Sequence, residues 1–492
     1  MMHSETVSPK NHVIMNEELK NRIEEWHETD HHQEIIDALE RIPAAKRDYD
    51  TTGLLARAYN NSGEYDKAAK ALETVRKKGE KDALWNYRMG YSQYFLDNYQ
   101  EALGYLNKAH ALDPDDADTI QLIRLCNVKM PLTGRVEEFW NWFVKNEKKL
   151  SGMVNPETHE DAEELMAFVH EGTSLISENI YYNLGGDHKF TFSVEGCPDL
   201  FIIYPYIISR MPESLKPKWK FFPFNNGTDK AFGFSMYGAD INTDHIMVRA
   251  SYLEDSDCFN ITYCDKNLGT LTKNESDIAM WIILESTLGE GVSYKYIDEI
   301  ERVSKPQKDM IPLPELKGHI RKILEDHSRQ LFENPKEVYS GYSMEPQKSD
   351  ELRYDVITGF TCLSPIVADY YDDSAEIFDH INSFGAQAVY IAIQNPDDTE
   401  LSSILNLRHE IEDRLTAEIL GPMNRGQVTG GATGTNCSYI DLIVYDLPGF
   451  IDAVKPLLSQ YPQYSFYLSE FRRHAGLKLL TEAVSSSSGN KE

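Results

Sequence analysis

An internal repeat with a period of 34 residues constrains this chain more than any other feature. Tyr65 and Tyr99 are 34 positions apart, and two alanines and two leucines show the same spacing. A fixed period of this length is typical of helical repeats that pack only against their neighbours, so it predicts two helical hairpins over residues 49–116. The matched positions are Tyr65/Tyr99, Ala68/Ala102 and Leu72/Leu106.

Further positions fit the same scheme. Small residues recur where two helices must approach closely, and Pro114 ends the second hairpin because proline cannot continue a helix. The pattern resembles the tetratricopeptide repeat family, although Gln93 replaces the usual aromatic residue and Glu80 the usual proline. The remaining matched positions are Leu55, Ala56, Tyr59, Met89, Gly90 and Ala109.

Two repeats cannot bury their faces alone, so flanking helical units are expected on both sides. Residues 32–42 match residues 65–75 at an offset of 33, which indicates a degenerate repeat over residues 16–48. Residues 117–127 place apolar side chains at helical spacing and read as a capping helix. The resemblance therefore covers a domain at residues 16–130, with an N-terminal segment 1–15 expected to be disordered.

The resemblance also implies a binding groove. In this family the first helix of each repeat lines a concave surface that binds a polypeptide, and here Tyr87, Tyr91 and Tyr94 form one stripe at positions i, i+4 and i+7. Burial of these rings in a core is the alternative interpretation. Amide and guanidinium groups beside aromatic rings suit an extended peptide or an acidic terminus, although lysines of the carboxylate-clamp type are missing. The predicted partner-binding residues are Arg57, Asn60, Asn61, Tyr87, Tyr91 and Tyr94.

The period is lost after Pro131, and strand-like runs then alternate with helical ones. This pattern predicts an α+β domain at residues 131–305. The expected helices there are Val136–Leu150, Asp161–Ser177, Leu200–Met211, Asp277–Thr287 and Tyr294–Val303. The expected strands are Lys189–Val194, Trp219–Phe224, Phe232–Tyr237, His245–Tyr252 and Cys258–Tyr263.

Residues 306–480 are predicted to form a second α+β domain, which begins with a helix at Glu315–Phe332. When the segment 395–436 is set aside, the remaining order is βαββαβ, the ferredoxin-like split arrangement. Residues 399–420 are expected to add a helix as an insertion. The elements in chain order are Tyr354–Thr361, Ala375–Ser383, Ala388–Ile393, Tyr439–Tyr445, Phe450–Leu458 and Tyr464–Leu468.

A glycine-rich segment at residues 429–437 is the most conspicuous candidate for ligand chemistry. Gly430, Gly431 and Gly434 could present backbone N–H groups to an anion or a peptide, with Arg425 assisting. A strand rather than a helix follows, and no lysine accompanies the glycines. The favoured interpretation is therefore a flexible connection or hairpin that uses glycine for positive φ angles.

Other polar residues allow weaker hypotheses. Asp441 and Asp446 are five residues apart on an expected strand and point to opposite faces, so they would not act together, and Asp446 is expected to cap the next helix. Cys362 and Cys437 are possible nucleophiles without a histidine neighbour in the sequence.

One helix carries three potential metal ligands on one face. His159, Glu163 and His170 share a helical face, but they lack an HExxH spacing and a recognisable fourth ligand. A solvated polar surface is the preferred interpretation, and neither a metal nor any other cofactor is expected.

Charge narrows the classes of partner. The chain of 492 residues has 49 Lys+Arg against 79 Asp+Glu, a formal charge of −30, which argues against nucleic acid and anionic membranes as partners. No continuous apolar run marks a secretory signal, so a cytoplasmic location is expected, and the serine-rich tail at 481–492 is expected to be disordered.

The sequence predicts a non-enzymatic interaction or regulatory protein. The alternative is an enzyme with a pocket between the two C-terminal domains that uses residues 429–437.

Overall fold

The computed structural model describes residues 15–349, 351–395 and 400–483. The chain divides into two compact units, Met1–Met130 and Pro131–Glu492, which are described separately below. The terminal segments expected to be disordered lie outside the described residues, apart from Met15 and residues 481–483. Thr481 belongs to a strand, so order extends at least that far.

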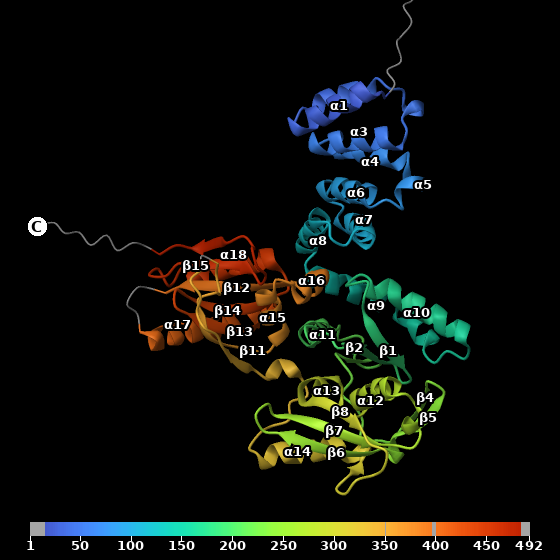
Figure 1. The fold of residues 1–492 in the computed structure, drawn as a ribbon, viewed down its shortest axis with the longest axis vertical. Coiled ribbons are helices and arrows are strands. Elements are labelled where there is room, and N and C mark those ends of the chain that lie inside the picture. Colours follow the sequence, from blue (N-terminus) through green and yellow to red (C-terminus); the bar gives the residue numbers. More distant parts are fainter. Residues whose placement is uncertain (1–14, 350, 396–399, 484–492) are drawn as a thin grey trace, which may run out of the picture. The chain divides into compact units, whose positions relative to one another are not determined.

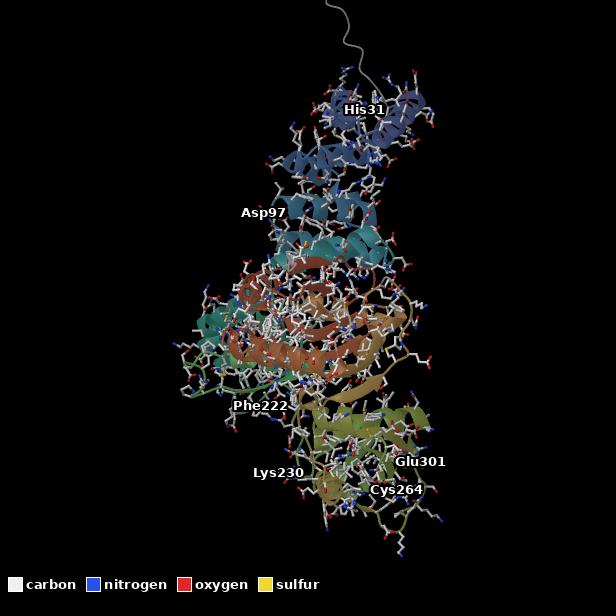
Figure 2. All side chains as sticks on the ribbon, turned by 90° about the vertical axis from the view of Figure 1, so that its left-hand side faces the viewer. His31, Asp97, Phe222, Lys230, Cys264 and Glu301 are labelled. Carbon is white, nitrogen blue, oxygen red and sulfur yellow. The ribbon has the colours of Figure 1, made fainter. Side chains whose placement is uncertain are left out.

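The first unit consists of helices within its described part (Figure 1). Helices are confirmed across residues 49–116, and His31 and Asp97 each lie in a turn between two helices (Figure 2). The helices are α1 (Glu17–Glu28), α2 (His32–Glu40), α3 (Tyr49–Asn61), α4 (Tyr65–Glu73), α5 (Arg76–Gly79), α6 (Ala83–Phe95), α7 (Tyr99–Leu112) and α8 (Ala117–Lys129).

The repeated small and large residues account for the packing of these hairpins. Ala68, Leu72, Ala102 and Leu106 are each 0% exposed, as expected for positions between paired helices. Gly90 of α6 lies so close to α7 that a Cβ atom there would come within 2.5 Å of Leu106 Cγ. The sequence repeat therefore corresponds to a repeated helix–helix contact.

The second unit begins with elements that share a core with its C-terminal sheet. Phe139, Phe190 and Phe201 belong to the same buried cluster as Tyr390 and Tyr439 from the end of the chain. The elements of this first part are α9 (Leu132–Met153), α10 (His159–Thr173), β1 (Tyr181–Gly185), β2 (Lys189–Ser193), α11 (Leu200–Ser209) and β3 (Lys220–Phe222).

The middle of the second unit has its own core. Its four-stranded sheet has the order β8-β7-β6-β9, and β4 and β5 form a separate hairpin. Leu316, Ile320 and Leu324 pack into the same cluster as residues 239–297, so the domain division expected at 305/306 cuts through a shared core and is wrong. The elements are β4 (Gly233–Met236), β5 (Ala239–Asn242), β6 (Met247–Leu253), β7 (Cys258–Cys264), α12 (Lys273–Leu288), α13 (Glu290–Tyr296), β8 (Ile297–Arg302), β9 (Ile311–Pro312) and α14 (Leu316–Asp326).

The helix expected at Tyr294–Val303 is also wrong, because most of this segment is strand β8. Ile297 and Ile300 are three residues apart, a spacing typical of one helical face. In the structure they pair with Phe259 and Ile261 of β7, across a register shift. This bulge adds one residue to β8 and lets both isoleucines pack on the same core.

The C-terminal part is a seven-stranded antiparallel sheet with the order β10-β11-β13-β14-β12-β15-β16. Both faces of strand β12 are covered: Ala388 and Tyr390 pack into one cluster, whereas Val389 and Ile391 pack into another. This burial explains its continuous apolar sequence. The elements are β10 (Ser340–Ser343), β11 (Val356–Thr361), α15 (Ser364–Asp372), α16 (Glu376–Ser383), β12 (Gln387–Gln394), α17 (Leu401–Arg414), β13 (Gly426–Gly434), β14 (Cys437–Val444), α18 (Leu447–Leu458), β15 (Phe466–Glu470) and β16 (Lys478–Thr481).

The strand order contradicts the ferredoxin-like prediction. A split βαβ unit places one strand between two parallel strands. Here two strands, β13 and β14, lie between β11 and β12, and three successive antiparallel pairings make β11 and β12 run in opposite directions. The error arose because the segment 395–436 was set aside, although it contains the strand β13.

Candidate functional site

A small hollow of about 240 Å³ lies on the first unit, where side chains from α1, α3 and α6 meet. All of the predicted partner-binding residues except Tyr94 line it. Three further residues, His27, Leu84 and Arg88, complete it. The full lining is His27, Arg57, Asn60, Asn61, Leu84, Tyr87, Arg88 and Tyr91.

Helix capping and close packing fix the two helices that contribute most to the hollow. Asp48 accepts a hydrogen bond from Thr51 N at 2.9 Å and so begins α3, and Asp82 does the same for α6 through Trp85 N at 2.9 Å. Gly53 of α3 leaves the space that Arg88 occupies, since a Cβ atom there would lie 2.8 Å from Arg88 Nη1. The backbone therefore holds Arg88 at a defined place on the wall.

Two guanidinium groups face the hollow without an acidic partner. Burial lowers the pKa of Arg57, although the charge of Glu24 opposes this shift. Burial also lowers the pKa of Arg88 to about 10, and the like charge of Arg57 adds to that effect. In the part of the chain that the structure describes, neither side chain forms an ion pair. The two guanidinium groups thus lack an ion-paired carboxylate among the described residues, although the charge of Glu24 acts on Arg57 and that of Asp82 on Arg88.

His27 adds little to this positive charge. Burial lowers the pKa of its imidazole, and the charge of Arg57 lowers it further. The ring is therefore mainly neutral near pH 7, where it can either donate or accept a hydrogen bond.

Aromatic rings form the other wall. Tyr87 and Tyr91 lie one turn apart on α6 with ring centroids 6.1 Å apart, and Tyr91 also packs on Tyr65 and Phe95. Both tyrosines are half-buried. Burial raises the pKa of Tyr87 to about 12, so its hydroxyl remains a hydrogen-bond donor at neutral pH.

Two of the predicted partner-binding residues, Asn60 and Tyr94, differ in position from the other four. Asn60 is buried, and its amide donates to the Arg88 carbonyl at 3.1 Å and accepts from Ser92 Oγ at 2.8 Å. Asn60 thus joins α3 to α6, although it also lines the hollow. Tyr94 packs against Tyr99 and Phe95 outside the hollow.

Two of the additional wall residues carried a sequence signal. Leu84, Arg88 and Tyr91 are spaced four and three residues apart on one helix, so the aromatic stripe implied that Leu84 and Arg88 share its face. His27 comes from α1, which lies outside the two well-formed repeats, and only the tertiary structure brings it to this place.

The glycine-rich segment is not a loop. Gly430, Gly431 and Gly434 are buried in strand β13, whose backbone pairs with β11 on one side and β14 on the other. Arg425 does not face an anion site either, because it forms an ion pair with Asp446 at 2.8 Å. The hypothesis of an anion-binding loop is therefore wrong, since the ladder already uses these N–H groups. The favoured interpretation, a flexible connection or hairpin with glycines at positive φ, is wrong as well, because all three glycines lie in the strand and none has a positive φ.

The other candidates have structural partners. Asp446 accepts a hydrogen bond from Gly449 N at 3.1 Å and caps α18, which confirms that prediction. Burial raises the pKa of Cys362 to about 11 and that of Cys437 to about 12, so both thiols are protonated at neutral pH and are poor nucleophiles.

The polar helix face is exposed. His159 and Glu163 approach to 3.3 Å with 91% and 71% of their side-chain surfaces exposed, while His170 contacts Glu178 instead. Across the described ranges, no cluster of three or more His, Cys, Asp or Glu side chains is arranged to hold a metal ion.

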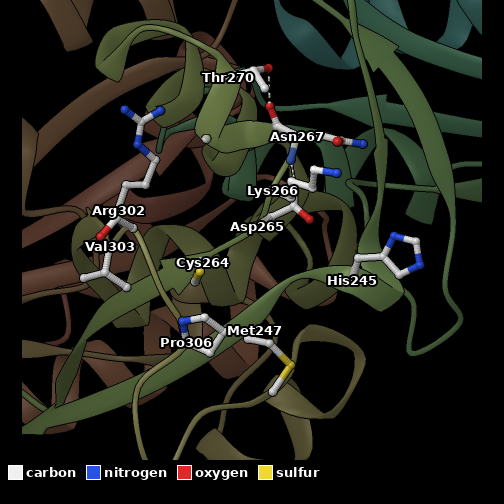
Figure 3. A pocket seen from close by; sticks show the side chains of 12 residues that line it. His245, Met247, Cys264, Asp265, Lys266, Asn267, Thr270, Arg302, Val303 and Pro306 are labelled. Carbon is white, nitrogen blue, oxygen red and sulfur yellow. Dashed lines mark hydrogen bonds between the residues drawn. The ribbon is translucent and has the colours of Figure 1, made fainter.

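The second unit contains a larger hollow of about 1010 Å³ beside β7 and the end of β8 (Figure 3). Two of its charged side chains form hydrogen bonds within the segment that borders it. Arg302 donates to the carbonyls of Leu268 and Leu271, each at 2.9 Å, and Asp265 accepts from the backbone of Asn267 at 2.8 Å. Burial raises the pKa of the Cys264 thiol, so this cysteine is a poor nucleophile at neutral pH.

The fold defines a mixed helix and sheet protein with a helical N-terminal unit, and the hollow on that unit brings two arginines together with two tyrosines. Searches for similarity find neither a matching protein family nor a matching curated protein sequence. None of the helices described is long and apolar enough to cross a bilayer.

Proposed function

We propose that the first unit is a tetratricopeptide-type module that binds a segment of another polypeptide in the hollow between α1, α3 and α6. One observation carries this proposal: Arg57 and Arg88, without acidic partners, converge with two half-buried tyrosines from α6. Arginine and tyrosine are the residue types that contribute most at protein interfaces. A peptide carboxylate would form charge-assisted hydrogen bonds with the guanidinium groups.

The second unit is proposed to act as a binding or regulatory module that the first unit connects to its partner. Its conspicuous polar residues are engaged within the fold, as the pairing of Arg425 with Asp446 illustrates. The alternative of an enzyme built on residues 429–437 loses its basis, because the glycines of this segment belong to a buried strand.

Selection of random displayed peptides on the immobilised full chain tests the proposal. Enriched peptides are labelled and titrated against the wild type and the Arg57→Glu variant by fluorescence anisotropy. We expect at least a ten-fold loss of affinity in the variant, because a glutamate at this position would repel the carboxylate of the peptide and pair with Arg88 instead. A tenfold change corresponds to about 1.4 kcal/mol, a usual size for an interface arginine.

Arg41→Glu is the matched control, since it makes the same charge change at an exposed residue outside the hollow. Melting curves for both variants should overlay that of the wild type. Equal affinity of the selected peptides for the wild type and Arg57→Glu would contradict the proposal, as would a failure to enrich any peptide.

A further inference from the structure

A second hollow of about 620 Å³ adjoins the first on the same unit. The two share Leu84 and Tyr87, so these side chains form the boundary between them. The walls of the second hollow come from α6, the end of α7 and the start of α8. Its lining is Lys81, Asp82, Ala83, Leu84, Tyr87, Leu112, Asp113, Asp116, Asp118 and Thr119.

The two hollows have opposite charge. The first carries Arg57 and Arg88, whereas the second carries four aspartates and one lysine. Two of these aspartates cap helices: Asp82 begins α6, and Asp116 begins α8 by accepting from Thr119 N at 3.1 Å. Asp113 and Asp118 are exposed on the wall. The groove formed by both hollows is therefore positive at one end and negative at the other.

Apolar surface lies between the two ends. Leu84 is 52% exposed and Leu112 is 50% exposed, so both present methyl groups to a ligand. Tyr87 lies beside them. Burial is the largest cause of its raised pKa, and the charge of Asp118 is the second largest. Tyr87 therefore lies within reach of the acidic wall while it also lines the basic hollow.

We propose that the partner segment is an extended peptide with an acidic residue at one end, an apolar residue in the middle and a basic residue at the other end. This inference rests on the proposed function and specifies the chemistry of its ligand. The carboxylate would lie against Arg57 and Arg88, the apolar side chain on Leu84 and Tyr87, and the cation beside Asp113 and Asp118. A run of acidic residues would meet repulsion at the second hollow, which provides discrimination by unfavourable contacts.

Short synthetic peptides with fluorescent labels test the inference on the full chain. The probes are acetyl-Asp-Ala-Leu-Ala-Lys-amide and its reverse sequence, with diacidic, dibasic and uncharged versions as comparisons. We expect at least one mixed-charge peptide to bind ten-fold more tightly than the diacidic and dibasic peptides. The advantage should decrease as salt rises from about 50 to about 500 mM, because exposed charges are screened.

A change of charge at the acidic wall provides the sharper test, because it predicts a gain of binding. The Asp113→Lys/Asp118→Lys variant should prefer the diacidic peptide over the mixed one, which reverses the wild-type order. Asp115→Lys is the matched control, since this residue is exposed and lies between the two but does not line the hollow. It should leave the order of preference unchanged.

The outcomes separate this inference from the proposed function. If the diacidic, mixed and uncharged peptides bind equally in a manner that depends on Arg57, the inference is wrong and the proposed function stands. If neither these probes nor any displayed peptide binds, both are wrong. Reversal of preference in the double variant, together with an unchanged control, supports both.

Discussion

Arginines of the two units differ in whether a carboxylate of the same unit pairs with them. An arginine without such a pair can bind a carboxylate of a partner, whereas a buried and paired arginine stabilises the fold. Arg57 and Arg88 lie on an open wall of the first unit and form no ion pair in the described part of the chain. Arg353 of the second unit is 0% exposed and donates to both oxygens of Asp441, at 2.5 and 3.2 Å.

Aromatic rings surround Arg353 as well as its carboxylate partner. The guanidinium carbon lies 4.4 Å from the centroid of Phe471 and 5.1 Å from that of Tyr439, and the Tyr342 hydroxyl accepts a further hydrogen bond at 3.1 Å. Aromatic rings do not distinguish this buried site from the hollow of the first unit, since both contain them. The two sites differ in whether a carboxylate of the same unit forms an ion pair with the arginine.

Loss of the buried charge should have the largest effect. Arg353→Met removes the partner of Asp441, which is 1% exposed and would be left buried and unpaired. The expected loss is about 3–5 kcal/mol in the free energy of unfolding of the second unit. Urea denaturation followed by tryptophan fluorescence measures it.

The double variant Arg353→Met/Asp441→Leu should recover part of that loss, because two apolar residues leave no unpaired charge. Arg57→Met should change the stability of the first unit by less than about 1 kcal/mol. If Arg353→Met and Arg57→Met had equal effects, the contrast between the two environments would be wrong.

The glycine that pairs with Asp441 in the sheet gives the next largest effect on stability. Gly430 of β13 lies opposite Asp441 in the β13–β14 pairing, and a Cβ atom there would come within 2.2 Å of the Phe360 carbonyl oxygen. Backbone atoms cannot easily move aside, so Gly430→Ala should cost about 1–3 kcal/mol. Differential scanning calorimetry would show a lower melting temperature for the second unit.

Gly318 provides the matched control, because it is exposed on α14 with no other atom near its added Cβ. Gly318→Ala should stabilise the protein by about 0.5–1 kcal/mol through helix propensity. A neutral Gly430→Ala would show that β13 tolerates side chains, and that close packing does not require glycine there.

Local sequence patterns predicted most helices and strands, but they did not predict how strands distant in the sequence pair with one another. The helices of residues 49–116 follow from contacts between residues close in sequence, such as Ala68 with its hairpin partners. Gly430 could not be understood in this way, because its small size is needed by Phe360, which lies far away in the sequence on another strand. The spacing of Ile297 and Ile300 led to the wrong prediction of a helix for a similar reason. Only the bulged pairing with β7 shows how both side chains of a strand face one core.

The candidate site was predictable to the extent that it lies on one helix. Tyr87 and Tyr91 form a stripe at i and i+4, and that spacing placed them on one face. Arg88 occupies the same helix and could have been found from it. The contribution of His27 and the use of Asn60 as a link between α3 and α6 depend on contacts between helices, which no spacing in the sequence specifies.

The smallest predicted effect concerns the arginines of the hollow on the first unit. Here the substitution should raise the stability of the unit, whereas the substitutions at buried residues above should lower stability. Arg88→Met keeps much of the side-chain length but removes a partly buried charge that Arg57 repels. It should therefore stabilise the first unit by about 0.5 kcal/mol, and added salt should reduce this gain by screening the repulsion in the wild type. The backbone carbonyl of Arg88 still accepts from Asn60, so the α3–α6 link is retained. Arg41→Met, at an exposed position outside the hollow, should show no such gain. A loss of more than about 1 kcal/mol in Arg88→Met would mean that Arg88 supports the fold as Arg353 does, and that its charge is not reserved for a partner.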